Sequence, residues 1–451
     1  MNKQQASEIV RGTFASAFDK SRFGQFALNI LNRLDDSKAQ QWSTQYIKDA
    51  FKDHVHRYER LGTYTAPDDR KLDVLVVHLA ADSKLERART AARNFVADHL
   101  KKRDEKDAAL VAFVSPSEQQ WRFSYVKMEY ATVEKDSGKI GVEERLTPAR
   151  RFSYLVGEGE SCHTAQTRFL GLLRETDKNP GLEDIEEAFS VEAVTDEFFE
   201  CYVELFEDIH AELDKLAAKD KVIRNEFKSM GVSTVDFAKK LLGQIVFLYF
   251  LQKKGWLGVE KGKEWGSGPR NFLRRLAMGE YGKYKNFFND ILEPLFYDTL
   301  ATDRGHEAWC KNFKCRIPFL NGGLFEPIAG YDWEKTDIVL PNDLFTNDEE
   351  IEEGIVGTGV LDVFDRYNFT VNESEPLEKE VAIDPEMLGK VFENLIEDNR
   401  RKGLGAFYTP REIVHYMCQE SLINYLDTAL NGAPAPAPSK TEIQGGLIGA
   451  E

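Results

Sequence analysis

The residue types best suited to chemistry stand close together near the end of the chain. Thr409 fits the N-cap of a helix, Pro410 fits its first position, and Glu412 completes a capping box with Thr409. A helix that begins here would point free N–H groups and the positive end of its dipole at an anion such as a carboxylate. Phe407 and Tyr408 would cover an apolar or cationic group, including a sulfonium. The same residues also fit an ordinary capped helix preceded by two core aromatic residues.

A resemblance favours the ligand-binding interpretation. The string Gly405-Ala-Phe-Tyr-Thr-Pro-Arg-Glu-Ile-Val-His-Tyr-Met417 resembles the motif that opens the catalytic domain of adenine-specific DNA methyltransferases. In that family the motif lines the methionine end of S-adenosylmethionine. The residues that the resemblance assigns to cofactor binding are Phe407, Tyr408, Thr409 and Pro410.

Two upstream segments extend the resemblance. Asp384-Pro-Glu-Met-Leu-Gly-Lys-Val-Phe-Glu-Asn-Leu395 is similar to the lead-in helix of these enzymes, and Gly322-Gly-Leu-Phe-Glu-Pro327 is similar to one of their loops. The likeness is to large single-chain restriction-modification enzymes of the type IIG kind and to phage-exclusion methyltransferases. It covers residues 180–430 with good specificity and residues 1–170 more loosely.

Two further motifs of these enzymes do not occur in the sequence. One is an Asp-Pro-x-x-Gly-x-Gly strand-turn that binds the rest of the cofactor, and the other is Asn-Pro-Pro-Tyr, which holds the extruded adenine. The resemblance therefore implies an N-terminal part of such an enzyme, which would not methylate DNA by itself. Its implied partners are double-stranded DNA and the missing catalytic and specificity domains.

Many relatives of this kind carry an N-terminal nuclease of the PD-(D/E)XK kind. Such a site needs two carboxylates and a lysine on adjacent strands, with Mg²⁺ between them. Asp73, at the start of an expected buried strand, is the candidate first carboxylate. Asp104-Glu-Lys106 has suitable residue types but precedes the next strand, and Lys127 and Glu129 stand in the wrong order. An active nuclease is one alternative, and a nuclease-like or plain interaction domain with Asp73 as a structural carboxylate is the other.

Two groups of basic residues are candidates for contacts with DNA phosphates. The first lies on the polar side of a predicted helix, and the second stands in the string Gly268-Pro-Arg-Asn-Phe-Leu-Arg-Arg275. Either group also fits a solvated surface. The candidates are Lys84, Arg87, Arg89 and Arg93 in the first group and Arg270, Arg274 and Arg275 in the second.

The elements that would position the N-terminal candidates have clear periodicities. Leu61–Thr65 and Lys71–Leu79 predict a β-hairpin, because a turn signal separates two β-rich runs. Ser83–Leu100 predicts an amphipathic helix, and Ala108–Val114 and Trp121–Tyr130 predict two more strands. This pattern is typical of a mixed α/β domain.

The rest of the chain is predicted to be mostly helical. Glu183–Lys228 and Ser233–Lys254 have helical periodicity, as do Pro385–Glu397 and Pro410–Leu430. The predicted fold class is thus α+β, with most of the chain helical. We predict a nuclease-like mixed α/β domain (1–175), a helical connector domain (176–380), the opening helices of a truncated α/β methyltransferase domain (381–432) and a disordered tail (433–451).

Composition narrows the class of protein. A formal net charge of −17 argues against a small basic nucleic-acid-binding module, but permits a large DNA enzyme with a local basic channel. Five cysteines without a C-x-x-C pair indicate a reducing compartment. His306, Cys310 and Cys315 lack a fourth ligand, so no metal site is predicted. The start of the chain has no signal core, and the longest apolar run, Leu241–Leu251, is too short for a membrane span. We expect a cytoplasmic protein.

Three hypotheses follow. The first is a restriction-modification adenine methyltransferase segment that positions DNA and contributes the first S-adenosylmethionine motif. The second is a non-catalytic subunit that binds DNA or protein. The third is an endonuclease, and only that hypothesis requires Mg²⁺.

Overall fold

The computed structural model contains a mixed α/β part followed by a largely helical region, as the sequence predicts. The chain forms two compact units, residues 1–387 and 388–451, which are treated separately below. The structure describes residues 2–102, 106–128, 131–134, 140–143, 149–175, 178–320, 322–352, 355–372, 377–387, 389, 409 and 411–431.

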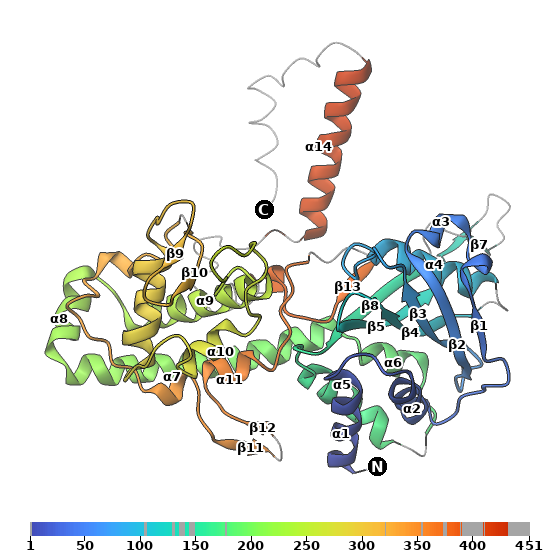
Figure 1. Ribbon diagram of the computed structural model, residues 1–451, viewed down its shortest axis with the longest axis horizontal. Helices are drawn as coiled ribbons and strands as arrows, with labels where there is room; N and C mark the ends of the chain where they lie inside the picture. Colours follow the sequence, from blue (N-terminus) through green and yellow to red (C-terminus); the bar gives the residue numbers. More distant parts are fainter. Residues whose placement is uncertain are drawn as a thin grey trace, which may run out of the picture. The chain divides into compact units, whose positions relative to one another are not determined.

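A seven-stranded mixed sheet organises the N-terminal part (Figure 1). Neighbouring strands in this sheet are antiparallel, except that β3 pairs with β4 and β8 pairs with β13 in parallel. The predicted hairpin is confirmed as β2 and β3, and the next predicted strand as β4. In spatial order the strands are β1 (Gln40–Trp42), β2 (Val55–Thr65), β3 (Lys71–Leu79), β4 (Ala108–Val114), β5 (Gln120–Met128), β8 (Ala149–Gly157) and β13 (Glu378–Glu380).

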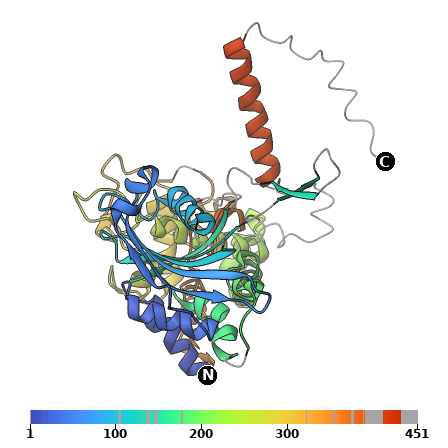
Figure 2. The ribbon, with the colours of Figure 1, turned by 90° about the vertical axis from the view of Figure 1, so that its right-hand side faces the viewer.

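Helices cover both faces of the sheet (Figure 2). The crossover from β3 to the parallel β4 runs through α4 (Arg89–Lys102), whose Phe95 and Val96 join an apolar core on one face. On the other face, helices α1 (Lys3–Phe14), α2 (Lys20–Leu31) and α5 (His163–Arg174) surround Phe123 of β5 with phenylalanine rings. Short elements of this part are η1 (Thr44–Tyr46), α3 (Asp49–Lys52) and the paired strands β6 (Ala131–Glu134) and β7 (Ile140–Glu143).

The helical region is built around α7 and α9. Helix α7 (Val191–Lys219) follows the N-cap Ser190, and α9 (Thr234–Lys253) follows the N-cap Ser233, whose hydroxyl accepts a hydrogen bond from the backbone of Asp236. The remaining elements are α6 (Leu182–Glu187), α8 (Lys221–Met230), α10 (Phe272–Ala277), η2 (Phe288–Leu292), η3 (Pro294–Leu300), β9 (Trp309–Cys310), β10 (Cys315–Arg316), η4 (Ile328–Gly330), η5 (Asn342–Leu344), β11 (Glu350–Glu352), β12 (Ile355–Val356) and α11 (Val360–Phe364).

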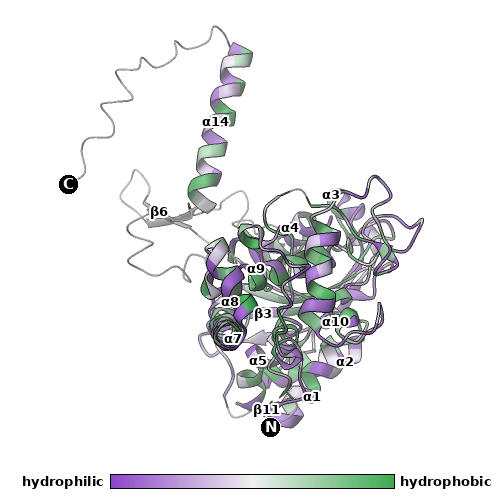
Figure 3. Cartoon of the chain, turned by 90° about the vertical axis from the view of Figure 1, so that its left-hand side faces the viewer, coloured by the Kyte–Doolittle hydropathy of each residue, from purple (hydrophilic) through white to green (hydrophobic). Residues whose placement is uncertain are grey.

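The second unit contributes one described helix, α14 (Arg411–Asn431), close to the predicted helix Pro410–Leu430. Hydrophobic and hydrophilic residues alternate along it (Figure 3). Its apolar side chains are exposed, among them Met417 at 58% and Leu430 at 80%. Within the described part of the chain, no helix is both long and apolar enough to cross a membrane.

Candidate functional site

Asp73, the candidate nuclease carboxylate, is completely buried in β3. Its Oδ1 accepts a hydrogen bond of 2.6 Å from the hydroxyl of Thr63 on the neighbouring strand. Its Oδ2 lies 2.9 Å from Nε2 of His99 and 3.4 Å from the guanidinium of Arg60. Both carboxylate oxygens are therefore engaged by groups of the protein itself.

The electrostatics of this cluster fit an ionised structural carboxylate. Burial raises the pKa of Asp73, but hydrogen bonds from His99 and Thr63 and the nearby charge of Arg60 outweigh it, so the pKa lies below its ordinary value. The residue opposite Asp73 on β4 is Ala109, which offers no second carboxylate. Among the residues that the structure describes, no group of three His, Cys, Asp or Glu side chains is placed to hold a metal ion.

Of the other residues considered for a nuclease site, Lys127 of β5 has a carboxylate partner of its own, because it forms a 2.6 Å ion pair with Glu186 of α6. Lys106 is buried, while Asp104, Glu105 and Glu129 lie outside the described residues.

The predicted basic face at α4 divides into two parts. Lys84 and Arg87 are exposed and precede the helix, which begins at Arg89. The interpretation of this group as a solvated face is wrong for Arg93, which is only 4% exposed. Arg89 and Arg93 stand one helical turn apart and turn toward the sheet, because a carboxylate on β13 attracts both.

That carboxylate belongs to Glu378, which lies in a cage of arginines. Its oxygens are 3.4 Å from Arg89, 3.7 Å from Arg93 and 3.6 Å from Arg151 of β8. Neither oxygen accepts a hydrogen bond from the described part of the protein. Glu378 is thus held by charge more than by directed hydrogen bonds.

A second pair extends the cage along β13. Glu380 accepts a 3.2 Å hydrogen bond from Arg122 of β5, whose guanidinium also lies 3.4 Å from the half-exposed Glu86. Four arginines, Arg89, Arg93, Arg122 and Arg151, therefore face only two buried carboxylates. Because a buried charge is costly unless it is paired, the two glutamates of β13 are essential partners for this layer.

The pKa values reflect this crowding of positive charge. Burial lowers the pKa of Arg151 to about 10, with Glu378 opposing the shift and the other arginines adding to it. Burial raises the pKa of Glu380, but the charges of Arg122 and Lys253 outweigh it, and the pKa lies below its ordinary value. The layer between α4 and the sheet therefore contains a buried charged cluster beside the apolar core that Phe95 and Val96 join.

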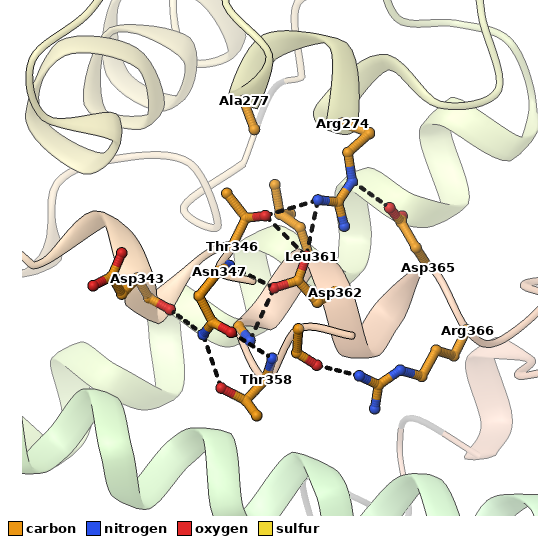
Figure 4. Close-up of polar contacts among 12 residues, drawn as sticks. Arg274, Ala277, Asp343, Thr346, Asn347, Thr358, Leu361, Asp362, Asp365 and Arg366 are labelled. Atoms are coloured by element: carbon orange, nitrogen blue, oxygen red, sulfur yellow. Dashed lines mark hydrogen bonds and ion pairs between the residues drawn. The ribbon is translucent and has the colours of Figure 1, made fainter. Parts of the chain in front are cut away.

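The second predicted basic group lies around α10, and each of its three arginines has a partner in the protein. Arg274 binds Asp365 through Nε at 2.7 Å and Asp362 through Nη1 at 2.9 Å (Figure 4). Arg275 forms a 2.6 Å ion pair with Glu280. Arg270 is exposed but donates to the backbone carbonyl of Lys253.

Arg274 is the centre of a network that orders the loop before α11. Its Nη1 also binds the hydroxyl of Thr346 at 2.8 Å, and Asp362 accepts from the backbone N–H of Asn347 at 2.9 Å. The Asn347 side chain in turn holds Thr358 (Figure 4). The network gives Arg274 a structural role, while its predicted contact with DNA stays a prediction.

Of the four residues assigned to cofactor binding, the structure describes only Thr409. Phe407, Tyr408 and Pro410 lie outside the described residues. Thr409 is exposed, and α14 begins two residues later at Arg411. The upstream loop that resembles the same enzymes is anchored on α9, since Gln244 donates to the carbonyl of Leu324 at 2.8 Å.

Sequence reasoning missed the arginine cage and one buried acid. Within β8, Arg151-Phe-Ser-Tyr154 alternates polar and apolar residues over four positions, which is a signal for a strand. Glu293 in the helical region is fully buried, and its carboxylate accepts from the hydroxyl of Tyr331 at 2.5 Å. Burial raises the pKa of Glu293 to about 8.

Comparison with known proteins gives one relative. No family model and no solved structure matches the chain. A protein of Methanocaldococcus jannaschii, described by inference as a type II restriction enzyme and methyltransferase, is 32% identical over 254 residues. The match covers 51% of this chain and 19% of the relative, so the chain spans about a fifth of the relative's length. The chain is thus distantly related, over half its length, to a restriction-modification enzyme and methyltransferase.

Proposed function

We propose that this chain is the DNA-positioning and cofactor-contributing part of a restriction-modification adenine methyltransferase that uses S-adenosylmethionine. The observation that carries the proposal is the 32% identity, over half the chain, with the archaeal protein described as a restriction enzyme and methyltransferase. The motif Gly405–Met417 supports it independently, because its resemblance is to the opening of the adenine-specific catalytic domain.

In this proposal the chain binds and orients the cofactor. S-adenosylmethionine supplies the methyl group when bound. The start of α14 offers N–H groups for the methionine carboxylate, and Phe407 and Tyr408 cover the sulfonium. Thr409 is exposed and so accessible to a ligand. No methyl-transfer step is assigned to this chain, because the Asn-Pro-Pro-Tyr motif does not occur in its sequence.

Duplex DNA would meet the sheet domain at its exposed cations. Lys84 and Arg87 are exposed, and we assign them to phosphate contacts. The burial of Asp73 against His99 and Arg60 favours a nuclease-like domain without a metal site over an Mg²⁺-dependent nuclease. A non-catalytic DNA-binding role is therefore the second candidate.

Titration calorimetry of the 451-residue chain with S-adenosylmethionine tests the cofactor assignment. We expect Tyr408→Ala to weaken binding at least ten-fold and Tyr408→Phe to weaken it little, because the ring face makes the contact. Tyr425→Ala, an exposed position on α14, is the matched control. Wild-type affinity in Tyr408→Ala would show that the motif is wrongly assigned. A wild-type chain that binds DNA in a salt-dependent manner but no cofactor would leave the second candidate.

A further inference from the structure

The helical region has a local surplus of positive charge that the proposed function does not use. Residues 253–285 contain nine lysines and arginines against three glutamates, although the whole chain has 59 basic and 76 acidic residues. Lys253 and Arg274 pair with acidic residues outside this segment, and the other seven basic residues still outnumber its glutamates. The segment Trp309–Arg316 adds three basic residues and no acidic one. An acidic protein that concentrates cations in one region has a candidate surface for a polyanion.

A closed loop presents part of this charge. The carbonyl of Gly255 accepts hydrogen bonds from the N–H groups of Gly266 at 3.1 Å and Gly268 at 2.9 Å. A Cβ at Gly268 would lie 2.1 Å from the carbonyl oxygen of Leu257, so only glycine fits there. Residues 255–268 therefore form a preorganised loop.

Two exposed tryptophans flank the closure of this loop. Trp256 follows Gly255, and Trp265 precedes Gly266, and each is 40% exposed. The hydrogen bond between Gly255 and Gly266 brings these two positions together. Two partly exposed tryptophans at neighbouring backbone positions make this part of the surface a candidate binding site.

The hairpin β9–β10 contacts the loop of residues 255–268. Val259 and Arg316 exchange two backbone hydrogen bonds, of 3.1 and 2.7 Å. The guanidinium of Arg316 lies 4.4 Å from the ring centre of Trp265 and donates to the carbonyl of Lys263 at 2.7 Å. Arg316 thus holds the backbone at Lys263 and the ring of Trp265 against the hairpin.

The lysines of this loop and of the β9–β10 hairpin turn are available to a ligand. All are exposed, and within the described part of the chain none forms an ion pair with a carboxylate. We define the basic tryptophan surface as Lys254, Trp256, Lys261, Lys263, Trp265, Lys311 and Lys314.

We propose that the basic tryptophan surface binds single-stranded or locally unpaired DNA, with lysines on the phosphates and Trp256 and Trp265 stacked on bases. Lysines fit any phosphate backbone, but an exposed aromatic ring needs a base face to stack on. A paired duplex hides its base faces within the stack, whereas an unpaired strand offers them. The inference rests on the proposed function only in taking DNA as the ligand.

Fluorescence anisotropy with a labelled oligothymidylate, a duplex of the same length and the full chain tests the inference. We expect the oligothymidylate to bind more tightly than the duplex. Lys261→Gln with Lys263→Gln should reduce the slope of log K against log salt by about 1.4, since each phosphate contact on a single strand contributes about 0.7. Lys221→Gln with Lys228→Gln, both exposed on α8, is the control and should leave the slope unchanged.

A tryptophan substitution tests the stacking separately. Trp256→Leu should weaken oligothymidylate binding about ten-fold or more and leave duplex binding nearly unchanged. Trp256 is preferred to Trp265, because Trp265 also contacts Arg316 and its loss could disturb the loop.

Three outcomes would overturn the inference: a lysine pair variant that matches the control, unchanged strand binding in Trp256→Leu, or tighter binding of the duplex. If those results accompany normal cofactor binding and normal DNA affinity, the proposed function stands and only this surface is misassigned. If the chain binds single-stranded DNA as expected but does not bind S-adenosylmethionine, the surface is correctly assigned and the proposed function is wrong.

Discussion

Arg122 of β5 and Glu380 of β13 form a buried ion pair at 3.2 Å although they stand 258 positions apart in the sequence. The pair joins the sheet to a strand that the chain reaches only after the whole helical region. Beside β8 (Figure 1), β13 also brings Glu378 to three more arginines. The stability of the sheet should therefore depend on carboxylates that lie far from it in sequence.

Glu378→Gln is expected to destabilise the protein by about 3–5 kcal/mol, because it removes the carboxylate nearest to Arg89, Arg93 and Arg151 from a largely buried cluster. Urea unfolding at neutral pH measures the loss. Lys379→Gln is the neighbouring control, since Lys379 pairs at the surface with Glu192, and its effect should stay below about 1 kcal/mol. Adding Arg151→Met to Glu378→Gln should recover part of the loss. Equal stability of Glu378→Gln and Lys379→Gln would show that Glu378 does not stabilise the arginines around it.

Asp73→Asn should cost about 2–4 kcal/mol, because a neutral amide replaces a buried carboxylate that holds His99, Thr63 and Arg60. The pKa of Asp73 lies below its ordinary value. Its contribution to stability is therefore complete above the unfolded-state pKa of about 3.9 and is lost as the pH falls through the folded-state pKa. Thermal unfolding at several pH values measures this.

Adding MgCl₂ distinguishes the structural role of Asp73 from metal binding. We expect Mg²⁺ to leave the melting temperature of wild type and Asp73→Asn unchanged. A Mg²⁺-dependent rise in the wild type alone, with DNA cleavage, would favour the endonuclease hypothesis instead.

Glu293 should make the stability of the protein fall with pH in the range between about 4.3 and 8. Its pKa is raised to about 8 in the folded state, so the unfolded chain releases the proton first as the pH rises. Stability then falls by up to about 1.4 kcal/mol per pH unit and levels off above pH 8. Glu293→Gln should remove this fall, while Glu264→Gln, an exposed control, should keep it. Parallel curves for wild type and Glu293→Gln would refute the assignment.

Arg274→Lys should destabilise the helical region by about 2–3 kcal/mol, since one ammonium group cannot serve Asp362, Asp365 and Thr346 together. Arg275→Lys, which changes a single partly exposed pair with Glu280, should cost less than about 1 kcal/mol. Denaturant unfolding gives both values. If Arg274→Lys instead keeps full stability and lowers the salt dependence of DNA binding, Arg274 contacts phosphate.

Local sequence signals were sufficient for the elements that depend on near neighbours. The turn between Leu61–Thr65 and Lys71–Leu79 predicted the hairpin β2–β3, and Ala108–Val114 is β4 residue for residue. Helical periodicity also placed Ser233–Lys254 correctly, because it depends on residues three and four positions apart.

Contacts between distant segments could not be predicted in the same way. Helical periodicity correctly grouped Arg89 with Arg93, but arginine on a helix is usually solvated, so the group was assigned to the surface. Their partly or fully buried positions are stabilised by Glu378, which lies hundreds of residues away in the sequence. The strand β13 is three residues long and charged, which leaves no periodic signal. The cofactor residues Phe407, Tyr408 and Pro410 lie outside the described residues and remain predictions.

The late arrival of β13 also sets the order in which the protein can fold during translation. A nascent chain that has emerged to residue 175 contains α4, β5 and β8 with all four arginines, but neither Glu378 nor Glu380. Its arginines must stay hydrated until the helical region has been synthesised. The sheet and the helical region should therefore reach their native state as one cooperative event at the end of synthesis, instead of folding one after the other from the N-terminus.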